Sequence, residues 1–324
     1  MALLEVEDLR VGFRTDDGRV EAVQGVSYTL DRGETLGIVG ESGSGKSVST
    51  MALLRLIPEP PARIRGRVTF DGLDLLRLAP GRLRAVRGNR IAMIFQDPMT
   101  CLNPFLRIST QMLETIELHT ALRGRAARDR AVWSLERVGI PGAGDRLDSY
   151  PHQFSGGMRQ RVMIAMALAC EPEVLIADEP TTALDVTIQA QILDLLRTLV
   201  REEGMALILI THALAVVAGL CERVAVMYGG RFVETAPTRE LFREPRHPYT
   251  EALLNALPRV DRRGAGPLAA IPGLPPRLDV PFTGCAFEPR CGLREARCLD
   301  GVPDLRGAPG GRAHACRVRQ ERSA

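Results

Sequence analysis

The hydrophobic positions along the first ninety residues follow a pattern typical of strands. Residues 5–13 and 19–30 alternate apolar and polar side chains, and Gly18 lies in a turn between them. A short apolar run at residues 35–39 leads into a glycine-rich turn, and residues 47–56 then have helical spacing that ends before Pro58. These patterns predict a β-rich start followed by strands that alternate with helices.

The middle of the chain continues this alternation. Residues 100–160 are polar and predicted helical, and they are followed by apolar runs at 174–177, 206–210 and 223–227. Between the first two runs, residues 186–203 carry apolar side chains at helical spacing. Short, almost wholly apolar strands that alternate with helices predict an α/β fold, with a parallel sheet covered on both faces.

The composition changes after residue 235, where Pro, Gly and Arg become frequent. Residues 258–276 have the composition of a linker, and the stretch after them has little apolar area to bury. We therefore expect it to need the main domain, a partner or a metal to hold its fold. The expected organisation is a main domain at 1–235, with a helical subdomain at about 100–160, and an extension at 236–324.

Charge and hydropathy exclude some functions. The net charge is +3 and the basic residues are scattered, which argues against a nucleic-acid partner. No apolar run approaches the ~20 residues that cross a bilayer, and the acidic, alternating start does not resemble a signal peptide. We therefore expect a cytoplasmic protein, in which disulfides are rare, with any membrane role exerted through a partner.

Basic residue usage singles out one position. The chain has 42 Lys and Arg residues, and all but Lys46 are Arg. Because Lys carries a compact ammonium and Arg a planar fork, a site that accepts only a point charge is implied. The alternative is the chance survival of one Lys in an Arg-rich chain.

Lys46 lies in the run GESGSGKS at residues 40–47, which matches the phosphate-binding pattern G-x-x-x-x-G-K-[ST] between a predicted strand and a predicted helix. Lys46 is placed to reach the β- and γ-phosphates of a nucleotide, and the Ser47 hydroxyl to bind Mg²⁺. Backbone N–H groups of such a loop curl around phosphate oxygens, and the helix N-terminus adds positive charge. The phosphate-binding residues are expected to include Gly40, Ser42, Gly43, Ser44 and Gly45. The alternative is a purely structural glycine-rich turn.

A second candidate element is the apolar run at 174–177, which ends in Asp178 and Glu179. Acids at the carboxyl end of a central strand face the ligand crevice of such folds. We expect Asp178 to hold Mg²⁺ through water and Glu179 to act as the general base toward the attacking water. The alternative is that the two acids only begin a loop.

The run FSGGM at residues 154–158, followed by RQR, resembles the signature motif of ABC ATPases. Ser155 is expected to cap a helix, so that Gly156 and Gly157 expose free N–H groups. In isolation this segment would be an ordinary capped helix. The resemblance implies that two such domains stack head to tail, so that the signature of each domain completes the ATP site of the other. A second ABC ATPase subunit, identical or homologous, is therefore an expected partner.

Other positions fit the same resemblance. Gln96 is similar to the family's Q-loop glutamine, which serves catalysis and Mg²⁺, and Asp185 to the D-loop acid. His212 resembles the H-loop histidine that contacts the γ-phosphate, and Phe13 the aromatic residue that stacks on adenine. The family fold is a P-loop NTPase core with a β-rich edge subdomain, an inserted helical subdomain and, here, a small Cys-bearing C-terminal appendage.

Two positions depart from the ABC pattern. Met158 stands in the signature where Gln is commoner, and Ala213 follows His212 where an acid is common. Because that acid is not a phosphate ligand, hydrolysis is expected to survive.

The branch of the family is indicated by QDPMTCLNP at residues 96–104 and HPYT at 247–250, which resemble ATPase subunits of dipeptide and oligopeptide importers. That resemblance implies two transmembrane permease subunits, an indirect link to an extracytoplasmic solute-binding protein, and a peripheral position at the cytoplasmic face of the cell (inner) membrane. Importers of nickel or other small solutes share these features. A soluble, non-transport ABC ATPase is a further alternative, although such proteins usually carry two ATPase units or long coiled coils.

Four of the seven cysteines lie in the extension with the spacing C-x5-C-x6-C-x17-C. Clustered thiols in a reducing compartment suggest metal, yet the close C-x2-C pairs usual for structural zinc are missing. Four thiolates also suit a [4Fe–4S] cluster, which the similar tails of the family imply. Zn²⁺ and unliganded thiols stay open as alternatives. The candidate ligands are Cys285, Cys291, Cys298 and Cys316.

Overall fold

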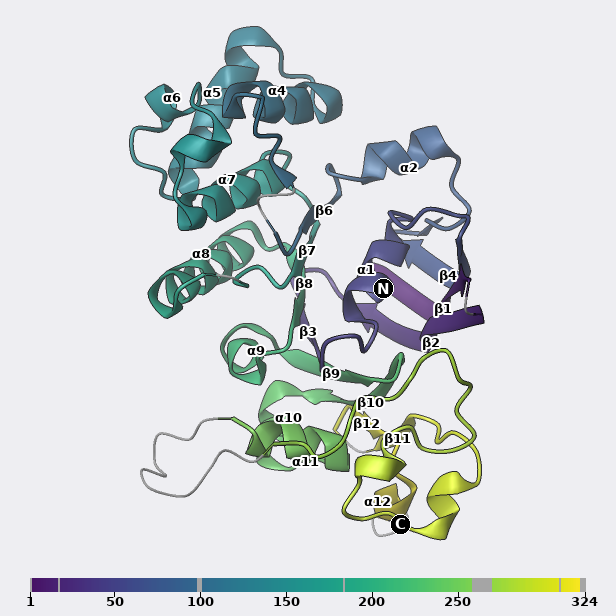
Figure 1. Ribbon diagram of the computed structural model, residues 1–324. Helices are drawn as coiled ribbons and strands as arrows, with labels where there is room; N and C mark the ends of the chain where they lie inside the picture. Colours follow the sequence, from purple (N-terminus) through teal and green to yellow (C-terminus); the bar gives the residue numbers. More distant parts are fainter. Residues whose placement is uncertain are drawn as a thin grey trace. The chain divides into compact units, whose positions relative to one another are not determined.

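The computed structural model describes residues 2–16, 18–97, 101–182, 184–257, 270–308 and 310–320 (Figure 1). The chain forms two compact units, and each is described by itself. The first unit combines Met1–Leu30, Thr35–Leu76 and Ile210–Ala324, and the second combines Asp31–Glu34 with Arg77–Leu209. The C-terminal extension thus shares a unit with the phosphate-loop sequence.

The first unit begins with an antiparallel sheet in which the strands follow the order β2-β1-β4-β5. Strand β1 alternates buried and exposed positions, and a bulge at Asp8, with a φ of 44°, shifts the alternation by one residue. The strands predicted at 5–13 and 19–30 are therefore confirmed. The bounds are β1 Leu4–Thr15, β2 Gly18–Leu30, β4 Ala62–Phe70 and β5 Leu73–Asp74.

A second run of strands in the first unit links the centre of the fold to the tail. The order is β11-β12-β10-β9-β3, in which β3 and β9 are parallel and the other neighbours are antiparallel. Every residue of β3 is buried, as its apolar sequence predicts. The bounds are β3 Thr35–Val39, β9 Arg223–Tyr228, β10 Arg231–Pro237, β11 Arg306–Ala308 and β12 Arg312–His314.

The helices of the first unit are short. They are α1 Lys46–Leu53, α9 Leu214–Leu220, α10 Thr238–Arg243, α11 Pro248–Asn255 and α12 Arg317–Gln320. Helix α1 ends at Leu53, three residues before the predicted end at residue 56. Arg55, just beyond the helix, has a φ of 50°, a left-handed conformation in which an α-helix cannot continue. Of the described helices, none is both long and apolar enough to cross a membrane.

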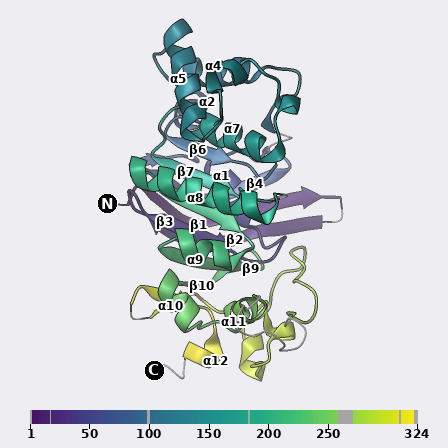
Figure 2. The same ribbon diagram turned by 90° about the vertical axis from the view of Figure 1, so that its left-hand side faces the viewer.

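The second unit holds the strands β6 Ile91–Ile94 and β7 Val174–Asp178, which pair in parallel, and β8 Ala206–Thr211, which follows β7 in the strand order. Its helical part confirms the predicted helical subdomain and appears as a group of packed helices in Figures 1 and 2. The helices are α2 Pro80–Val86, α4 Ile108–His119, α5 Gly124–Arg137, α6 Ala143–Arg146, α7 Gly156–Leu168 and α8 Val186–Glu203.

The tail is supported by the rest of its own unit. Strand β12 pairs with β10, so that Thr235 lies opposite Ala313. Phe287 is 3% exposed, and its ring packs against those of Tyr228 and Tyr249. Of the three expected supports, the main domain, a partner or a metal, these contacts supply the first. The first part of the predicted linker, residues 258–269, lies outside the described residues.

Candidate functional site

The phosphate loop, residues 40–47, connects β3 to α1 as the sequence predicts. Gly45 has a φ of 100°, and a Cβ there would lie 2.2 Å from the carbonyl oxygen of Ala22, so only glycine fits. Lys46 is 5% exposed, and its Nζ donates to the carbonyls of Gly40 at 2.8 Å and Glu41 at 2.9 Å. The lone lysine therefore folds back over the loop that it belongs to.

The loop also holds a buried hydroxyl. Among the residues that the structure describes, the Ser44 Oγ has no hydrogen-bond partner although the side chain is buried. A buried, unsatisfied hydroxyl is costly unless a ligand completes it. The neighbouring Ser42 and Gly43 are exposed. An orphaned hydroxyl beside exposed loop residues fits a loop that receives phosphate.

Phe13, the candidate adenine-stacking residue, lies on β1 in the first unit. It lines an open hollow of about 600 Å³ together with Arg14, Arg19 and Arg63. An aromatic ring among guanidinium groups offers both a stacking face and positive charge. This arrangement suits the base of a nucleotide.

His212, the candidate H-loop residue, directly follows β8 and is exposed. The next residue, Ala213, donates its backbone N–H to the Thr211 hydroxyl at 3.0 Å. Ala213, at the position where the family often has an acid, thus precedes helix α9 as its N-cap and carries no charge.

The second unit brings Gln96 and Glu179 together. Strands β6 and β7 are parallel neighbours with Ile94 opposite Ala177, so the residues after each strand meet at one edge. Gln96 Nε2 donates to Glu179 Oε2 at 3.1 Å, and Thr182 Oγ1 donates to the same oxygen at 2.8 Å. One oxygen of the carboxylate is therefore held by two donors.

Two further features mark this strand end. Asp178 is 5% exposed. Glu179 has a φ of 46°, a left-handed conformation that is strained for a residue other than glycine and that clusters at functional sites. Sequence reasoning missed Thr182 as a contact of Glu179, because a threonine in a loop carries no sign of its partner.

The signature segment forms the predicted capped helix. The Ser155 side chain accepts a hydrogen bond from the Met158 N–H at 3.3 Å at the start of α7, and Ser155 and Gly156 are exposed. A Cβ on Gly157 would lie 2.7 Å from Ile188 Cγ2 of α8. Asp185 caps α8 by accepting from the Ile188 N–H at 2.9 Å. Ser155 is thus needed to cap the helix and Gly157 to pack against α8, while Ser155 and Gly156 leave the start of α7 exposed.

The four tail cysteines line one small cavity of about 20 Å³, in which Cys298 and Cys316 are buried. Burial raises the pKa of Cys285 to about 11 and also raises the pKa of Cys291. Within the described ranges, no three His, Cys, Asp or Glu side chains are placed to hold one metal ion. The cysteines are brought together as predicted, but the structure does not support the metal itself.

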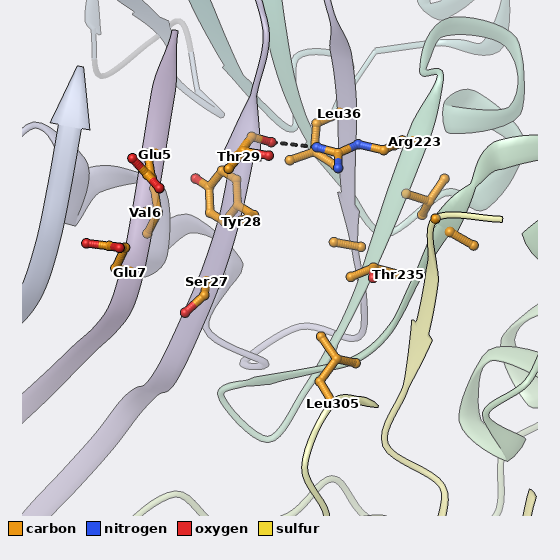
Figure 3. A pocket seen from close by; sticks show the side chains of 14 residues that line it. Glu5, Val6, Glu7, Ser27, Tyr28, Thr29, Leu36, Arg223, Thr235 and Leu305 are labelled. Carbon is orange, nitrogen blue, oxygen red and sulfur yellow. Dashed lines mark hydrogen bonds between the residues drawn. The ribbon is translucent and has the colours of Figure 1, made fainter. Parts of the chain in front are cut away.

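A separate hollow of about 350 Å³ lies in the first unit beside β1, β2, β9 and β10 (Figure 3). Its polar lining includes Glu5, Glu7 and Arg223, whose Nη2 donates to the carbonyl of Thr29 at 2.5 Å. None of the predicted site residues lines it. The hollow is therefore no part of the candidate nucleotide site.

Comparison with protein families gives two matches. The ABC transporter family matches residues 23–182, and the oligopeptide/dipeptide transporter C-terminal region matches residues 233–298. The two matches cover the phosphate loop, the signature segment and the strand end at Glu179 on one side, and three of the four tail cysteines on the other.

Individual relatives match over most of the chain. The oligopeptide transport ATP-binding protein OppD of Salmonella typhimurium is 52% identical over 97% of this chain and 93% of its own length. The dipeptide transport ATP-binding protein DppD of Bacillus subtilis is 51% identical over 91% of this chain and 88% of its own length.

Solved structures are also similar. The ATP-binding cassette MJ0796, solved as a dimer in a post-hydrolysis state with ADP and phosphate, has a TM-score of 0.65 at 27% identity, over 73% of this chain and 99% of that one. CbiO1 of Clostridium perfringens, part of the transporter complex cbiONQ, has a TM-score of 0.62 at 31% identity, over 75% of this chain and 91% of that one. These similarities confirm the predicted α/β fold.

Proposed function

The chain belongs to the ATP-binding proteins of ABC transporters and is an ATP-hydrolysing subunit; from this premise we propose that it powers a membrane importer of di- or oligopeptides. The observation that carries the proposal is the match to the oligopeptide/dipeptide transporter C-terminal region, at residues 233–298. The curated relatives that match along nearly the whole chain are named for peptide transport, which supports the same cargo class.

We assign the binding of ATP to the residues of the phosphate loop and to Phe13. Loop N–H groups and Lys46 neutralise the β- and γ-phosphates, and Phe13 stacks on adenine. The buried, unpartnered hydroxyl of Ser44 supports a phosphate ligand at this loop. Mg²⁺, when bound, offsets charge on the phosphates, and Ser47, Asp178 and Gln96 are its proposed ligands.

Glu179 is the proposed general base. Its carboxylate takes a proton from the water that attacks the γ-phosphorus, and ADP leaves with the bridging oxygen. Gln96 and Thr182 orient the carboxylate through the hydrogen bonds to Oε2. His212 contacts the γ-phosphate and stabilises the charge that develops there.

The site is completed by a second ATPase subunit, identical or homologous. Ser155, Gly156, Gly157 and Asp185 of each chain serve the nucleotide held by the other. The exposed start of α7 supports this, because its first-turn N–H groups are open to an anion. ATP closes the pair and hydrolysis reopens it.

The proposed assembly adds two transmembrane permease subunits, which this chain meets at the cytoplasmic face of the cell membrane, and an extracytoplasmic solute-binding protein. An importer of nickel or another small solute is the alternative cargo assignment. The test is to purify the chain with the membrane proteins that accompany it. ATPase activity should rise with peptide-loaded binding protein; a rise with nickel or a sugar instead would reject the peptide assignment.

We also propose that the tail cysteines hold a [4Fe–4S] cluster. The four side chains line one cavity, which supplies the required thiolates. Such a cluster takes one thiolate on each of its four irons, which matches the number of tail cysteines.

The cluster is tested by purification without oxygen. Brown protein with broad absorption near ~400 nm and roughly four irons per chain is expected. Replacing any one of the four cysteines with Ser should lower the iron content and loosen the tail, because binding energy at such sites is folding energy. Colourless protein with about one zinc, or with four freely titrating thiols, would reject the cluster.

A further inference from the structure

The C-terminal tail reaches the phosphate loop through one arginine. Arg290 lies in the 3-10 turn Glu288–Arg290, and its side chain is 5% exposed. Its Nη1 donates to Glu41 Oε2 at 2.7 Å and its Nη2 to Glu41 Oε1 at 2.9 Å. Glu41 is the second residue of the phosphate loop. A bidentate pair of this kind fixes the orientation of both side chains.

The surroundings of Arg290 leave it no freedom to swing away. Nη1 also donates to the Tyr228 hydroxyl at 3.2 Å, and Nε donates to the carbonyl of Pro272 at 2.8 Å. The guanidinium lies 5.8 Å from the ring centroid of Tyr228 and 5.9 Å from that of Phe287. A charge buried this deeply is destabilising unless it is paired, so Arg290 depends on the Glu41 carboxylate.

Glu41 is tied in turn to the phosphate-binding lysine. Its carbonyl accepts from Lys46 Nζ at 2.9 Å, and its N–H donates to the Tyr249 hydroxyl at 2.9 Å. The tail lies near the loop at a second place, where Pro275 and Pro276 line a small pocket with Ser42 and Gly43. Glu41 thus links the tail to the lysine, because its carboxylate accepts two bonds from Arg290 and its carbonyl accepts one from Lys46.

We propose that Arg290 is a positioning residue of the nucleotide site, through which the cysteine-bearing tail sets the affinity for ATP. The proposal rests on the proposed ATP site. Glu41 is a carboxylate in a loop that receives a polyphosphate, and without Arg290 its charge repels the ligand. Arg290 removes that repulsion and holds the loop in one conformation.

The test measures ATP affinity of the full chain by equilibrium binding. Arg290→Gln should raise the Kd for ATP about tenfold, equivalent to about 1.4 kcal/mol. Adding Glu41→Gln to that variant should recover most of the affinity, because the unpaired charge is gone. Arg290→Lys keeps the charge but loses the bidentate fork, so its Kd for ATP should lie between those of the wild type and Arg290→Gln.

The matched control is Arg277→Gln. Arg277 is an exposed tail arginine that pairs with Asp279, so its replacement should leave the Kd for ATP unchanged. The inference is overturned if Arg290→Gln binds ATP like this control. It is also overturned if Glu41→Gln gives no recovery, since Arg290 would then only hold the tail. A wild-type chain that binds no ATP would overturn the proposed function itself, and this inference with it.

Discussion

Replacing Glu179 with Gln separates basicity from geometry at the proposed catalytic carboxylate. Oε2 accepts from Thr182 Oγ1 at 2.8 Å and from Gln96 Nε2 at 3.1 Å. The amide oxygen of Gln can accept both bonds, so the side chain should keep its place. What it cannot do is take a proton from water.

The expected loss follows from that difference. General base catalysis contributes roughly 10²- to 10⁴-fold, so turnover should fall by that factor while ATP still binds and traps the closed dimer. Thr182→Val serves as a comparison, because it removes one of the two hydrogen-bond donors to Glu179 and keeps the general base. A hydrogen bond to a charged group is worth about 1.5–3 kcal/mol, so turnover should fall by roughly 10- to 160-fold.

The assay is phosphate release under single-turnover conditions, together with nucleotide affinity and size-exclusion chromatography for the dimer. Glu171→Gln is the matched control, since Glu171 is an acid of the same unit that pairs with Arg130. Turnover of Glu179→Gln within about threefold of wild type would refute the reasoning, because a lost general base costs far more than that. Equal losses for Glu179→Gln and Thr182→Val would also show that orientation, not basicity, is what the carboxylate supplies.

Two further substitutions test the site. Lys46→Arg should weaken ATP binding sharply, because the buried ammonium fits between the Gly40 and Glu41 carbonyls and a guanidinium does not. An unchanged Kd for ATP would mean that the sole lysine is accidental. Gly157→Ala should lower the melting temperature, since the added Cβ would lie 2.7 Å from Ile188 Cγ2; a destabilisation of about 1–3 kcal/mol is expected. A melting temperature equal to wild type would show that α7 and α8 adjust freely.

The strands and motifs that depend on local sequence could be predicted. The strands β3, β7, β8 and β9 could be predicted from their apolar runs, because a strand that is covered on both faces has a nearly continuous apolar sequence. The phosphate loop and the cap at Ser155 depend on residues that lie next to one another. Neither needs knowledge of a distant partner.

Elements that depend on distant contacts were missed. Strand β4 contains Gly66, which has a φ of 111° and where an added Cβ would lie 2.6 Å from the carbonyl of Asp8. Its neighbours Arg65 and Arg67 are both exposed, so the alternation of the strand is hidden in the sequence. The pair of Arg290 with Glu41 joins residues 249 positions apart, and no local pattern marks either side chain. Helix α11, with His247 accepting from the Tyr249 N–H as its cap, was visible only as a resemblance to importer ATPases.

The central claim is that ATP hydrolysis by this chain drives peptide uptake. The most direct test places the chain, its co-purified permease subunits and the binding protein in liposomes and follows a labelled oligopeptide. Uptake should require ATP on the side of this chain and should stop when Glu179→Gln replaces the wild type. Hydrolysis without peptide uptake, together with ATP-driven accumulation of nickel or a sugar, would contradict the account.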